Sequence, residues 1–283
     1  MLTRKFGWTH AQVPVIGQGT WMIEGDHAKE RRAIETLRLG LDLGLTHIDT
    51  AEMYGNGRAE ELVGEAIAGR RDRVFLASKV LPQNASYQGT IAACERSLRR
   101  LGTTWLDLHM LHWPGSHPIR ETMRAMEHLA VSGKIRHIGV SNFDVDELRE
   151  AESALSAGRI ACNQVLYHLK ERGIERRLLP YCAERTIAVV AYSPFGQRAF
   201  PAAGTPGGRV LTAIAQRHNR TPRQVAMNFV TRHGNVFTIP KTTHPERVRE
   251  NAGGTGWELT KEDLAEIDRA FPAPSKDKPL AML

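Results

Sequence analysis

Residues 74–112 read VFLASKVLPQNASYQGTIAACERSLRRLGTTWLDLHMLH, and this stretch decides the fold. It opens with a β-rich apolar segment, Val74–Lys79, and closes with another, Leu106–His112. Between the two, residues 86–101 carry apolar side chains at helical spacing. A strand, a helix and a second strand in this order predict that the two strands lie parallel in one sheet, with the helix packed on a face of that sheet.

The same alternation extends in both directions along the chain. Further β-rich runs lie at 46–49, 135–141, 160–164, 187–192 and 236–239, and an opening strand is expected near 15–20. The intervening stretches have amphipathic patterns, for example residues 28–43 with Ile34, Leu37 and Leu41 on one face. Eight such units predict an α/β fold, a (β/α)₈ TIM barrel, and no linker divides residues 1–283, so we expect a single domain with its active site at the C-terminal ends of the strands. A doubly wound sheet is the alternative, but no G-x-G-x-x-G turn follows the first strand.

Composition excludes several classes of function. The chain has 283 residues and a formal charge of +7, but its basic residues are scattered among acidic ones, which argues against a nucleic-acid partner. Three cysteines without C-x-x-C spacing suggest buried thiols in a reducing compartment, so we expect a cytoplasmic protein. No apolar stretch approaches the roughly 20 residues needed to span a membrane, and no histidine pairing has metal-ligand spacing.

Four titratable residues follow or end neighbouring strands: Asp49, Tyr54, Lys79 and His112. Each alone could be a loop cap or a residue of the barrel rim, but four on adjacent strands point to a site. Hydride addition to a carbonyl carbon leaves an alkoxide that needs a proton and nearby hydrogen-bond donors. Tyr54 is the plausible acid, and an adjacent Lys79 ammonium is expected to lower the pKa of the phenol toward the working pH.

These residues lie in motifs that resemble the aldo-keto reductase family. The first motif is Asp49-Thr50-Ala51-Glu52-Met53-Tyr54-Gly55, together with Lys79 and His112-Trp113. The others are 133–143 (GKIRHIGVSNF), Asn163-Gln164, 191–195 (AYSPF), and Ile239-Pro240-Lys241-Thr242 through Glu250-Asn251. The likeness covers nearly the whole chain. Finer features, such as Gln18-Gly19-Thr20-Trp21, resemble the bacterial branch that includes methylglyoxal reductases.

The resemblance implies a role for each matching residue. The implied catalytic tetrad is Asp49, Tyr54, Lys79 and His112. The implied cofactor-binding residues are Gly19, Thr20, Trp21, Asp49, Ser141, Asn142, Gln164, Tyr192, Ser193, Pro194, Phe195, Lys241, Thr242, Thr243, Arg247, Glu250 and Asn251. Ser141, Asn142 and Gln164 would bond the nicotinamide carboxamide, Tyr192 would stack on the ring, and the segment from Lys241 would contact the 2′-phosphate. The implied substrate-binding residues are Trp21, Tyr54, His112 and Trp113.

Together these roles imply NADPH-dependent reduction of aldehydes or ketones to alcohols. The leading substrates are small or aromatic aldehydes such as methylglyoxal, and diketogluconate-type keto sugars are the alternative. A barrel aldolase with a Lys79 Schiff base and a nicotinamide-sensing regulatory subunit are rivals of other classes. Analogy with the family favours a monomer.

Two segments depart from longer family members. The stretch after Phe195 is brief and rich in Ala, Gly and Pro, which predicts a short cofactor cover and fast cofactor release. Beyond Phe271 only Pro272–Leu283 remain, so the substrate pocket is expected to have few walls from this tail and to be open.

Overall fold

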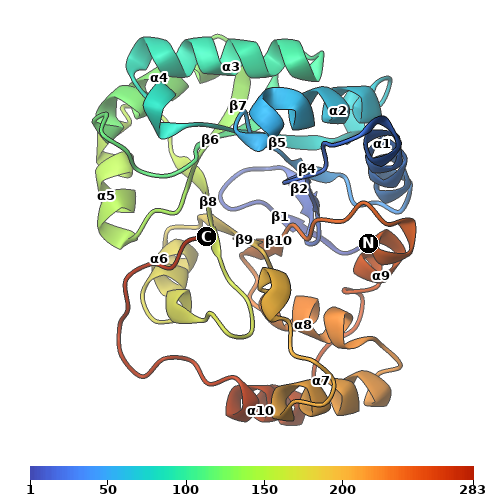
Figure 1. Ribbon diagram of the computed structural model, residues 1–283. Helices are drawn as coiled ribbons and strands as arrows, with labels where there is room; N and C mark the ends of the chain where they lie inside the picture. Colours follow the sequence, from blue (N-terminus) through green and yellow to red (C-terminus); the bar gives the residue numbers. More distant parts are fainter.

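Eight parallel strands form the centre of the molecule, and helices surround them (Figure 1). The computed structural model describes residues 1–283, except for the side chain of Arg198. The strands of the sheet are β3 (Gln18–Gly19), β4 (His47–Asp49), β5 (Phe75–Val80), β6 (Leu106–Leu111), β7 (Ile135–Ser141), β8 (Ile160–Leu166), β9 (Ala188–Tyr192) and β10 (Val236–Thr238). Their spatial order follows the chain from β3 to β10.

The sheet closes on itself. Parallel bridges join Ile16 to Thr238 and Gly19 to Lys241, so the segment around β3 also pairs with β10 and its continuation. This confirms the predicted (β/α)₈ barrel and excludes the doubly wound alternative, in which the sheet would stay open. All seven β-rich runs and the opening strand named from the sequence coincide with strands of this sheet.

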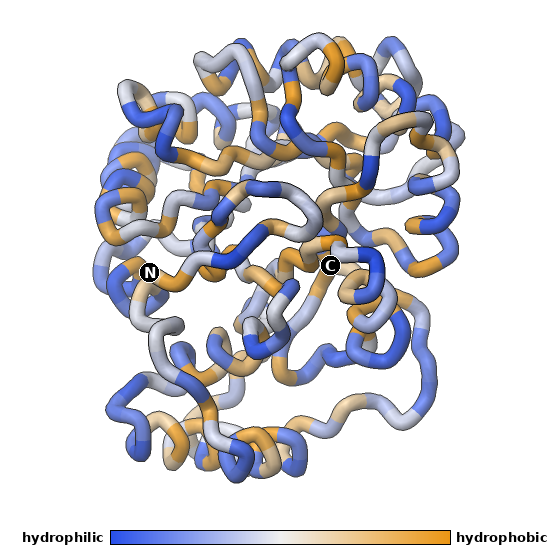
Figure 2. Tube along the Cα trace, turned by 180° about the vertical axis from the view of Figure 1, so that it is seen from behind, coloured by the Kyte–Doolittle hydropathy of each residue, from blue (hydrophilic) through white to orange (hydrophobic). Residues whose placement is uncertain are grey.

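The helices lie outside the strands, and their residues follow the predicted amphipathic pattern. They are α1 (His27–Asp42), α2 (Arg58–Ile67), α3 (Tyr87–Leu101), α4 (Ile119–Val131), α5 (Val145–Ala154), α6 (Leu178–Glu184), α7 (Pro206–Arg217), α8 (Pro222–Val230), α9 (Pro245–Ala252) and α10 (Lys261–Ala270). Short 3₁₀ turns are η1 (Tyr54–Gly57), η2 (Arg71–Arg73), η3 (Pro82–Asn84), η4 (Gly173–Glu175) and η5 (Gln197–Ala199). Along these helices, polar and apolar residues alternate (Figure 2).

Helix α3 shows why these segments fold as they do. The Ser86 side chain caps the N-terminus by accepting a hydrogen bond from the Gly89 amide. At the other end Gly102 adopts φ +61°, a left-handed conformation that ends the helix at little steric cost. Ala93, Cys94 and further residues at helical spacing are buried against the strands. Among the described residues, no helix is long and apolar enough to cross a membrane.

One element was not predicted from the sequence. An antiparallel hairpin, β1 (Thr3–Lys5) with β2 (Gln12–Pro14), precedes the barrel and covers the N-terminal ends of its strands. Phe6, next to this hairpin, is fully buried, and its ring lies 4.8 Å from that of Phe75 and 5.0 Å from that of Phe237. The hairpin thus closes the bottom of the barrel with aromatic packing and leaves the opposite end for a site.

Candidate active site

The four predicted catalytic residues converge at the C-terminal ends of β4, β5 and β6. Asp49 is the last residue of β4, Lys79 lies near the end of β5, and His112 directly follows β6. Tyr54 begins the turn η1 after β4. Side chains alternate between the two faces of a strand, and these strand residues are on the inward-facing register. The structure therefore brings all four residues together, as the sequence predicted.

Lys79 is the centre of this group. Its side chain is fully buried, and its Nζ lies 2.7 Å from Asp49 Oδ2, 2.9 Å from the Thr50 carbonyl oxygen and 3.2 Å from the Tyr54 hydroxyl. An ammonium group has three protons to donate, and each has an acceptor here. Lys79 is thus fixed in one position, with its charge directed at the Tyr54 oxygen.

A left-handed turn places Tyr54 over this lysine. Gly55, Asn56 and Gly57 have φ values of 56°, 53° and 95°, which turn the chain sharply before α2 begins. Glycine adopts this conformation without the steric cost that a Cβ atom adds. The Tyr54 ring packs edge-on to His112, with ring centres 5.8 Å apart. The glycine-rich sequence after Tyr54 therefore fixes the direction of its hydroxyl.

The charge balance around Tyr54 corrects one expectation. Burial raises the pKa of Tyr54 above its ordinary value, and the Lys79 charge opposes this rise without reversing it. The expectation that Lys79 lowers this pKa toward the working pH was wrong, because the phenol is more deeply buried than its sequence position suggested. Burial acts to lower the pKa of Lys79, but Asp49 and Tyr54 outweigh it, so this pKa is raised. At neutral pH the phenol is protonated and the lysine is charged.

His112 is neutral across the physiological range. Burial, reinforced by the Lys79 charge, lowers the pKa of His112 to about 2. Its Nδ1 is buried and has no hydrogen-bond partner among the described residues. A neutral imidazole carries one N–H and one acceptor nitrogen. His112 can therefore act as a hydrogen-bond donor through Nε2 without carrying charge.

Gln164 holds the second oxygen of Asp49. Its Nε2 donates to Asp49 Oδ1 at 2.7 Å, and the glutamine is almost fully buried. The carboxylate therefore has separate donors for its two oxygens, Gln164 for one and Lys79 for the other. This arrangement satisfies a buried charge with hydrogen bonds, which burial requires.

Next to the tetrad, Ser141 at the end of β7, Asn142 directly after it and Tyr192 at the end of β9 form a connected wall. The Ser141 hydroxyl donates to the Gln164 carbonyl oxygen at 2.9 Å. Asn142 Nδ2 donates to the His112 carbonyl oxygen at 3.1 Å, and its Oδ1 accepts from the Tyr192 hydroxyl at 2.9 Å. Asn142 has φ +59°, a conformation that asparagine tolerates better than most residues. The wall links β6 through β9, which the sequence could not show.

A cavity of about 170 Å³ opens between the tetrad and this wall. Its lining contains Gly19, Thr20, Trp21, Asp49, Met53, Tyr54, His112, Trp113, Ser141, Asn142, Gln164, Tyr192, Ser193, Gln197, Ile239, Lys241 and Leu283. Both tryptophans expected to contact substrate, Trp21 and Trp113, line this cavity. Met53, Gln197, Ile239 and Leu283 were not predicted. Met53 could have been inferred because it adjoins Tyr54, but no local pattern brings Gln197 or Leu283 to this place.

One residue of the tail, Leu283, lines this cavity, and the expectation of an open pocket with few walls from the tail stays a prediction. The chain from Pro272 crosses the face of the barrel, and its end lies near the centre of the ring of helices (Figure 1). Burial raises the pKa of Tyr192 to about 12, and a hydrogen bond with the Leu283 backbone reduces this rise. Twelve residues are enough to reach the cavity because extended chain spans roughly 3.3 Å per residue.

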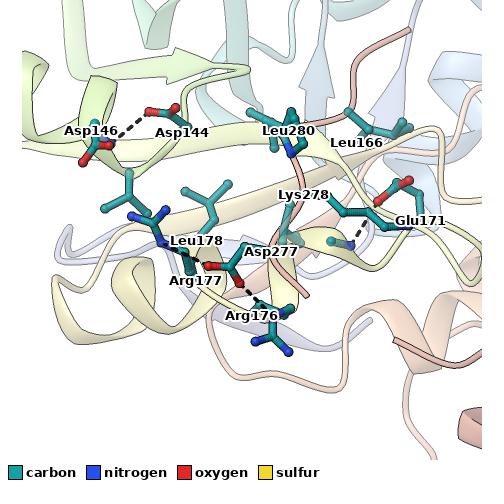
Figure 3. Close-up of a pocket in the computed structure, with 15 residues that line it drawn as sticks. Asp144, Asp146, Leu166, Glu171, Arg176, Arg177, Leu178, Asp277, Lys278 and Leu280 are labelled. Atoms are coloured by element: carbon teal, nitrogen blue, oxygen red, sulfur yellow. Dashed lines mark hydrogen bonds and ion pairs between the residues drawn. The ribbon is translucent and has the colours of Figure 1, made fainter. Parts of the chain in front are cut away.

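A larger cavity, about 320 Å³, lies beside the tail and contains none of the tetrad (Figure 3). Asp277 of the tail forms an ion pair with Arg176 at 2.7 Å and lies 4.0 Å from Arg177. Leu280 and Leu166 lie on the wall of the same cavity. These contacts attach the tail to the segment before α6 and direct its last residues toward the smaller cavity.

The remaining predicted cofactor residues lie outside the small cavity, with the exception of Lys241. Those outside are Pro194, Phe195, Thr242, Thr243, Arg247, Glu250 and Asn251. Thr242 Oγ1 accepts a hydrogen bond from the His244 amide at 3.0 Å just before α9. Asn251 is buried, and Glu250 Oε1 accepts from the Thr221 hydroxyl at 2.6 Å. This segment forms an outer region that continues from the cavity through Lys241.

No group of three His, Cys, Asp or Glu side chains that could hold a metal ion occurs among the described residues. The three cysteines are buried and unpaired with one another. The groups available for chemistry are thus a phenol, an ammonium, a carboxylate and a neutral imidazole.

A (β/α)₈ barrel with this tetrad at its C-terminal face defines a class of enzyme, and comparison with protein families agrees with it. Residues 15–271 match the model described as the aldo/keto reductase family, and the chain belongs to that family, whose members are oxidoreductases.

Individual relatives fall in the same class. The chain is 46% identical over 271 residues to methylglyoxal reductase YeaE of Escherichia coli (strain K12), covering 96% of this chain and 95% of that protein. It is 37% identical over 260 residues to glyoxal reductase of Bacillus subtilis (strain 168), covering 91% of this chain and 88% of that protein. A crystal structure of an aldo/keto reductase from Klebsiella pneumoniae, in complex with NADP and acetate, superposes with a TM-score of 0.93. The two sequences are 43% identical and the match covers 99% of each chain.

Proposed function

We propose that this protein reduces small aldehydes and ketones to alcohols with NADPH, with methylglyoxal as the leading substrate. The observation that carries the proposal is the Lys79 contact with both Asp49 and Tyr54, at 2.7 and 3.2 Å. Similarity to the methylglyoxal and glyoxal reductases supports the substrate class. The expectations of a single domain, a monomer and a cytoplasmic location stay predictions.

The residues present fit the cofactor. Tyr192 offers a partly exposed ring at the cavity wall, next to the polar groups of Ser141, Asn142 and Gln164. A planar ring and neighbouring amides suit a nicotinamide with its carboxamide, since stacking and hydrogen bonds together fix the ring. Lys241 continues the site toward the outer region, where cations suit phosphates. When bound, NADPH supplies the hydride.

Tyr54 supplies the proton in this mechanism. Its raised pKa keeps the hydroxyl protonated at neutral pH, and the Lys79 ammonium at 3.2 Å stabilises the phenolate that remains after the proton is donated. Asp49 holds the lysine charged and in place. His112 donates a hydrogen bond from Nε2 to the substrate carbonyl oxygen and so orients the carbonyl for attack.

The apolar side chains that line the cavity favour small or aromatic aldehydes over keto sugars as substrates. Trp21, Met53, Trp113 and Leu283 are large apolar side chains at the cavity. A polyhydroxylated sugar would lose the hydrogen bonds that its hydroxyl groups make with water and gain few in return. A diketogluconate-type keto sugar therefore remains the weaker alternative.

The aldolase alternative requires a neutral, accessible lysine. Lys79 is fully buried, and its raised pKa keeps it charged, so it cannot attack a carbonyl. Borohydride reduction in the presence of substrate is expected to leave Lys79 unmodified. A covalent adduct on this residue would overturn the reductase mechanism.

The decisive test follows NADPH absorbance with methylglyoxal and with a nitrobenzaldehyde. Tyr54→Phe is expected to lower kcat by about 10²–10⁴-fold, the usual contribution of a general acid, and to leave NADPH binding intact. Tyr181→Phe is the matched control, because the Tyr181 hydroxyl bonds Glu152 at 2.6 Å, away from the cavity. NADPH binding with no turnover of either aldehyde would instead favour the regulatory-subunit alternative.

A further inference from the structure

Arg223, the second residue of α8, lies in a corner formed by two aromatic rings. Its guanidinium carbon is 4.7 Å from the ring centre of Phe195 and 4.8 Å from that of Phe200. The two rings are nearly perpendicular, with centres 5.7 Å apart. Because the rings are so close to each other, they contact the guanidinium from neighbouring directions and not from opposite faces. The corner therefore fixes the guanidinium and leaves another side of it open.

Unlike the paired arginines of this protein, Arg223 has no carboxylate partner. Arg58, Arg71 and Arg172 each lie 2.7 Å from a carboxylate oxygen. In the described part of the chain, no carboxylate oxygen lies within 4.0 Å of Arg223. The Glu250 carboxylate, whose charge acts on Arg223, is bonded to Thr221 instead. Arg223 is thus a half-buried cation, held in place, whose donors have no anionic acceptor.

The surroundings of Arg223 connect it to the outer region of the site. Phe195 follows β9 and the cavity residues Tyr192 and Ser193, and α8 packs against α9, which carries Arg247. Burial lowers the pKa of Arg223, Glu250 acts to raise it, and the Arg247 charge lowers it further. Two guanidinium groups therefore repel each other across this region, and an anion bound between them would relieve the repulsion.

The charges that act on Lys241 come from a different part of the site. Besides burial, the charges that act on the pKa of Lys241, which is lowered, are those of Lys29 and Glu24. Glu24 precedes α1 and Lys29 lies in its first turn, and α1 packs against α9, as α8 does. Arg247, and not Lys241, is therefore the cation whose charge acts on Arg223.

We propose that Arg223, together with Arg247, binds the 2′-phosphate of NADPH and is a specificity-determining residue for NADPH over NADH. This inference rests on the proposed function. A phosphate monoester carries nearly two negative charges at neutral pH, and an arginine can offer it two parallel N–H donors. The aromatic corner preorganises the Arg223 guanidinium, so this side chain loses less conformational entropy when the phosphate binds.

The test measures dissociation constants by titration of protein fluorescence or by calorimetry. The ligands form two pairs, NADPH with NADH and adenosine 2′,5′-bisphosphate with adenosine 5′-monophosphate. Within each pair, the ligands differ by the 2′-phosphate. Arg223→Leu keeps an apolar contact with both rings and removes the charge. It is expected to weaken NADPH and the bisphosphate about tenfold or more, as loss of a charged hydrogen bond does, and to change the other two ligands less than about twofold.

Arg220→Leu is the matched control, because Arg220 lies over the Trp257 ring at 5.8 Å, just before α8. It is expected to leave all four dissociation constants unchanged. Arg223→Lys keeps the charge without the planar fork and is expected to fall between wild type and Arg223→Leu.

The outcomes separate this inference from the proposed function. Equal losses for NADPH and NADH would overturn it in favour of stacking on adenine, and unchanged NADPH binding in Arg223→Leu would overturn it outright. A wild-type protein that binds none of the nucleotides would instead refute the proposed function, and with it any role for Arg223 in cofactor choice.

Discussion

His47 and Asp49 lie two residues apart on β4 and face the same barrel interior, but they differ in their hydrogen-bond partners. Both oxygens of Asp49 have donors, from Gln164 and Lys79. Both ring nitrogens of His47 are buried without a partner among the described residues, and its ring packs edge-on against Phe6 and Phe75. Burial lowers the pKa of His47 to about 4, so it is an uncharged packing residue.

The contrast shows what makes a buried polar residue functional. At the bottom of the barrel the hairpin and its aromatic packing bury His47, and a buried polar group without a protein partner costs stability. At the top, a charged pair is fully hydrogen-bonded and borders a cavity. A polar side chain inside the barrel is therefore informative only when its partners and its access are known. The following predictions separate the bottom layer of the barrel, around Phe6 and His47, from its catalytic layer, around Asp49 and Lys79.

The largest effect is expected from Lys79→Met. The change leaves the Asp49 charge buried without its partner, which costs about 3–5 kcal/mol of unfolding free energy, and removes the charge beside the Tyr54 hydroxyl. Turnover is expected to fall at least 10²-fold. Denaturant unfolding and NADPH oxidation measure the two effects.

The double variant Asp49→Asn with Lys79→Met sharpens this result. It is expected to recover much of the stability, because neither charge remains, but none of the activity. Recovery of both would show that the ion pair has only a structural role.

Phe6→Ala tests the bottom layer. Phe6 is fully buried between aromatic rings, so its truncation is expected to cost about 3–5 kcal/mol of unfolding free energy. The catalytic layer does not contact it, so kcat/KM per folded molecule is expected to stay within twofold of wild type. A loss of kcat/KM comparable to the loss of stability would contradict the separation of the two layers.

His47→Leu is expected to reduce acid sensitivity. The pKa of His47 is about 4 in the folded protein and about 6.5 in the unfolded chain, so the unfolded chain binds the proton first as the pH falls. The contribution of neutral His47 to the free energy of unfolding is therefore full above pH 6.5 and is lost as the pH falls toward 4. This difference between the folded and unfolded pKa corresponds to about 3 kcal/mol of unfolding free energy. Unfolding curves from pH 7 to 4 should flatten in the variant, and His10→Leu, at an exposed position, is the control. An unchanged slope would mean that His47 does not resist protonation.

The smallest effect concerns the pH dependence of reduction. Because burial raises the pKa of Tyr54 above 10, the phenol stays protonated, and kcat for reduction is expected to be flat between pH 7 and 9 and to fall only at higher pH. Alcohol oxidation, which needs the phenolate, should rise over the same range. A fall in reduction centred below pH 8 would mean that Lys79 dominates over burial.

The sequence by itself determined the barrel and the tetrad. Strand and helix periods are local properties, and the positions of Asp49, Lys79 and His112 at strand ends follow from the fold, because parallel strands present their C-terminal ends on one face. The motifs extended this to Ser141 and Asn142 of the wall and to Gln164, which bonds Asp49.

Only the tertiary structure decided the features that depend on contacts distant in sequence. The hairpin that covers the barrel bottom, the tail that brings Leu283 to the cavity, and the aromatic corner around Arg223 have no local pattern. The pKa of Tyr54 belongs with them, because the sequence identified the Lys79 charge but not the depth of burial that opposes it. Burial is a sum over surrounding atoms from many segments, and it exists only once the chain has folded.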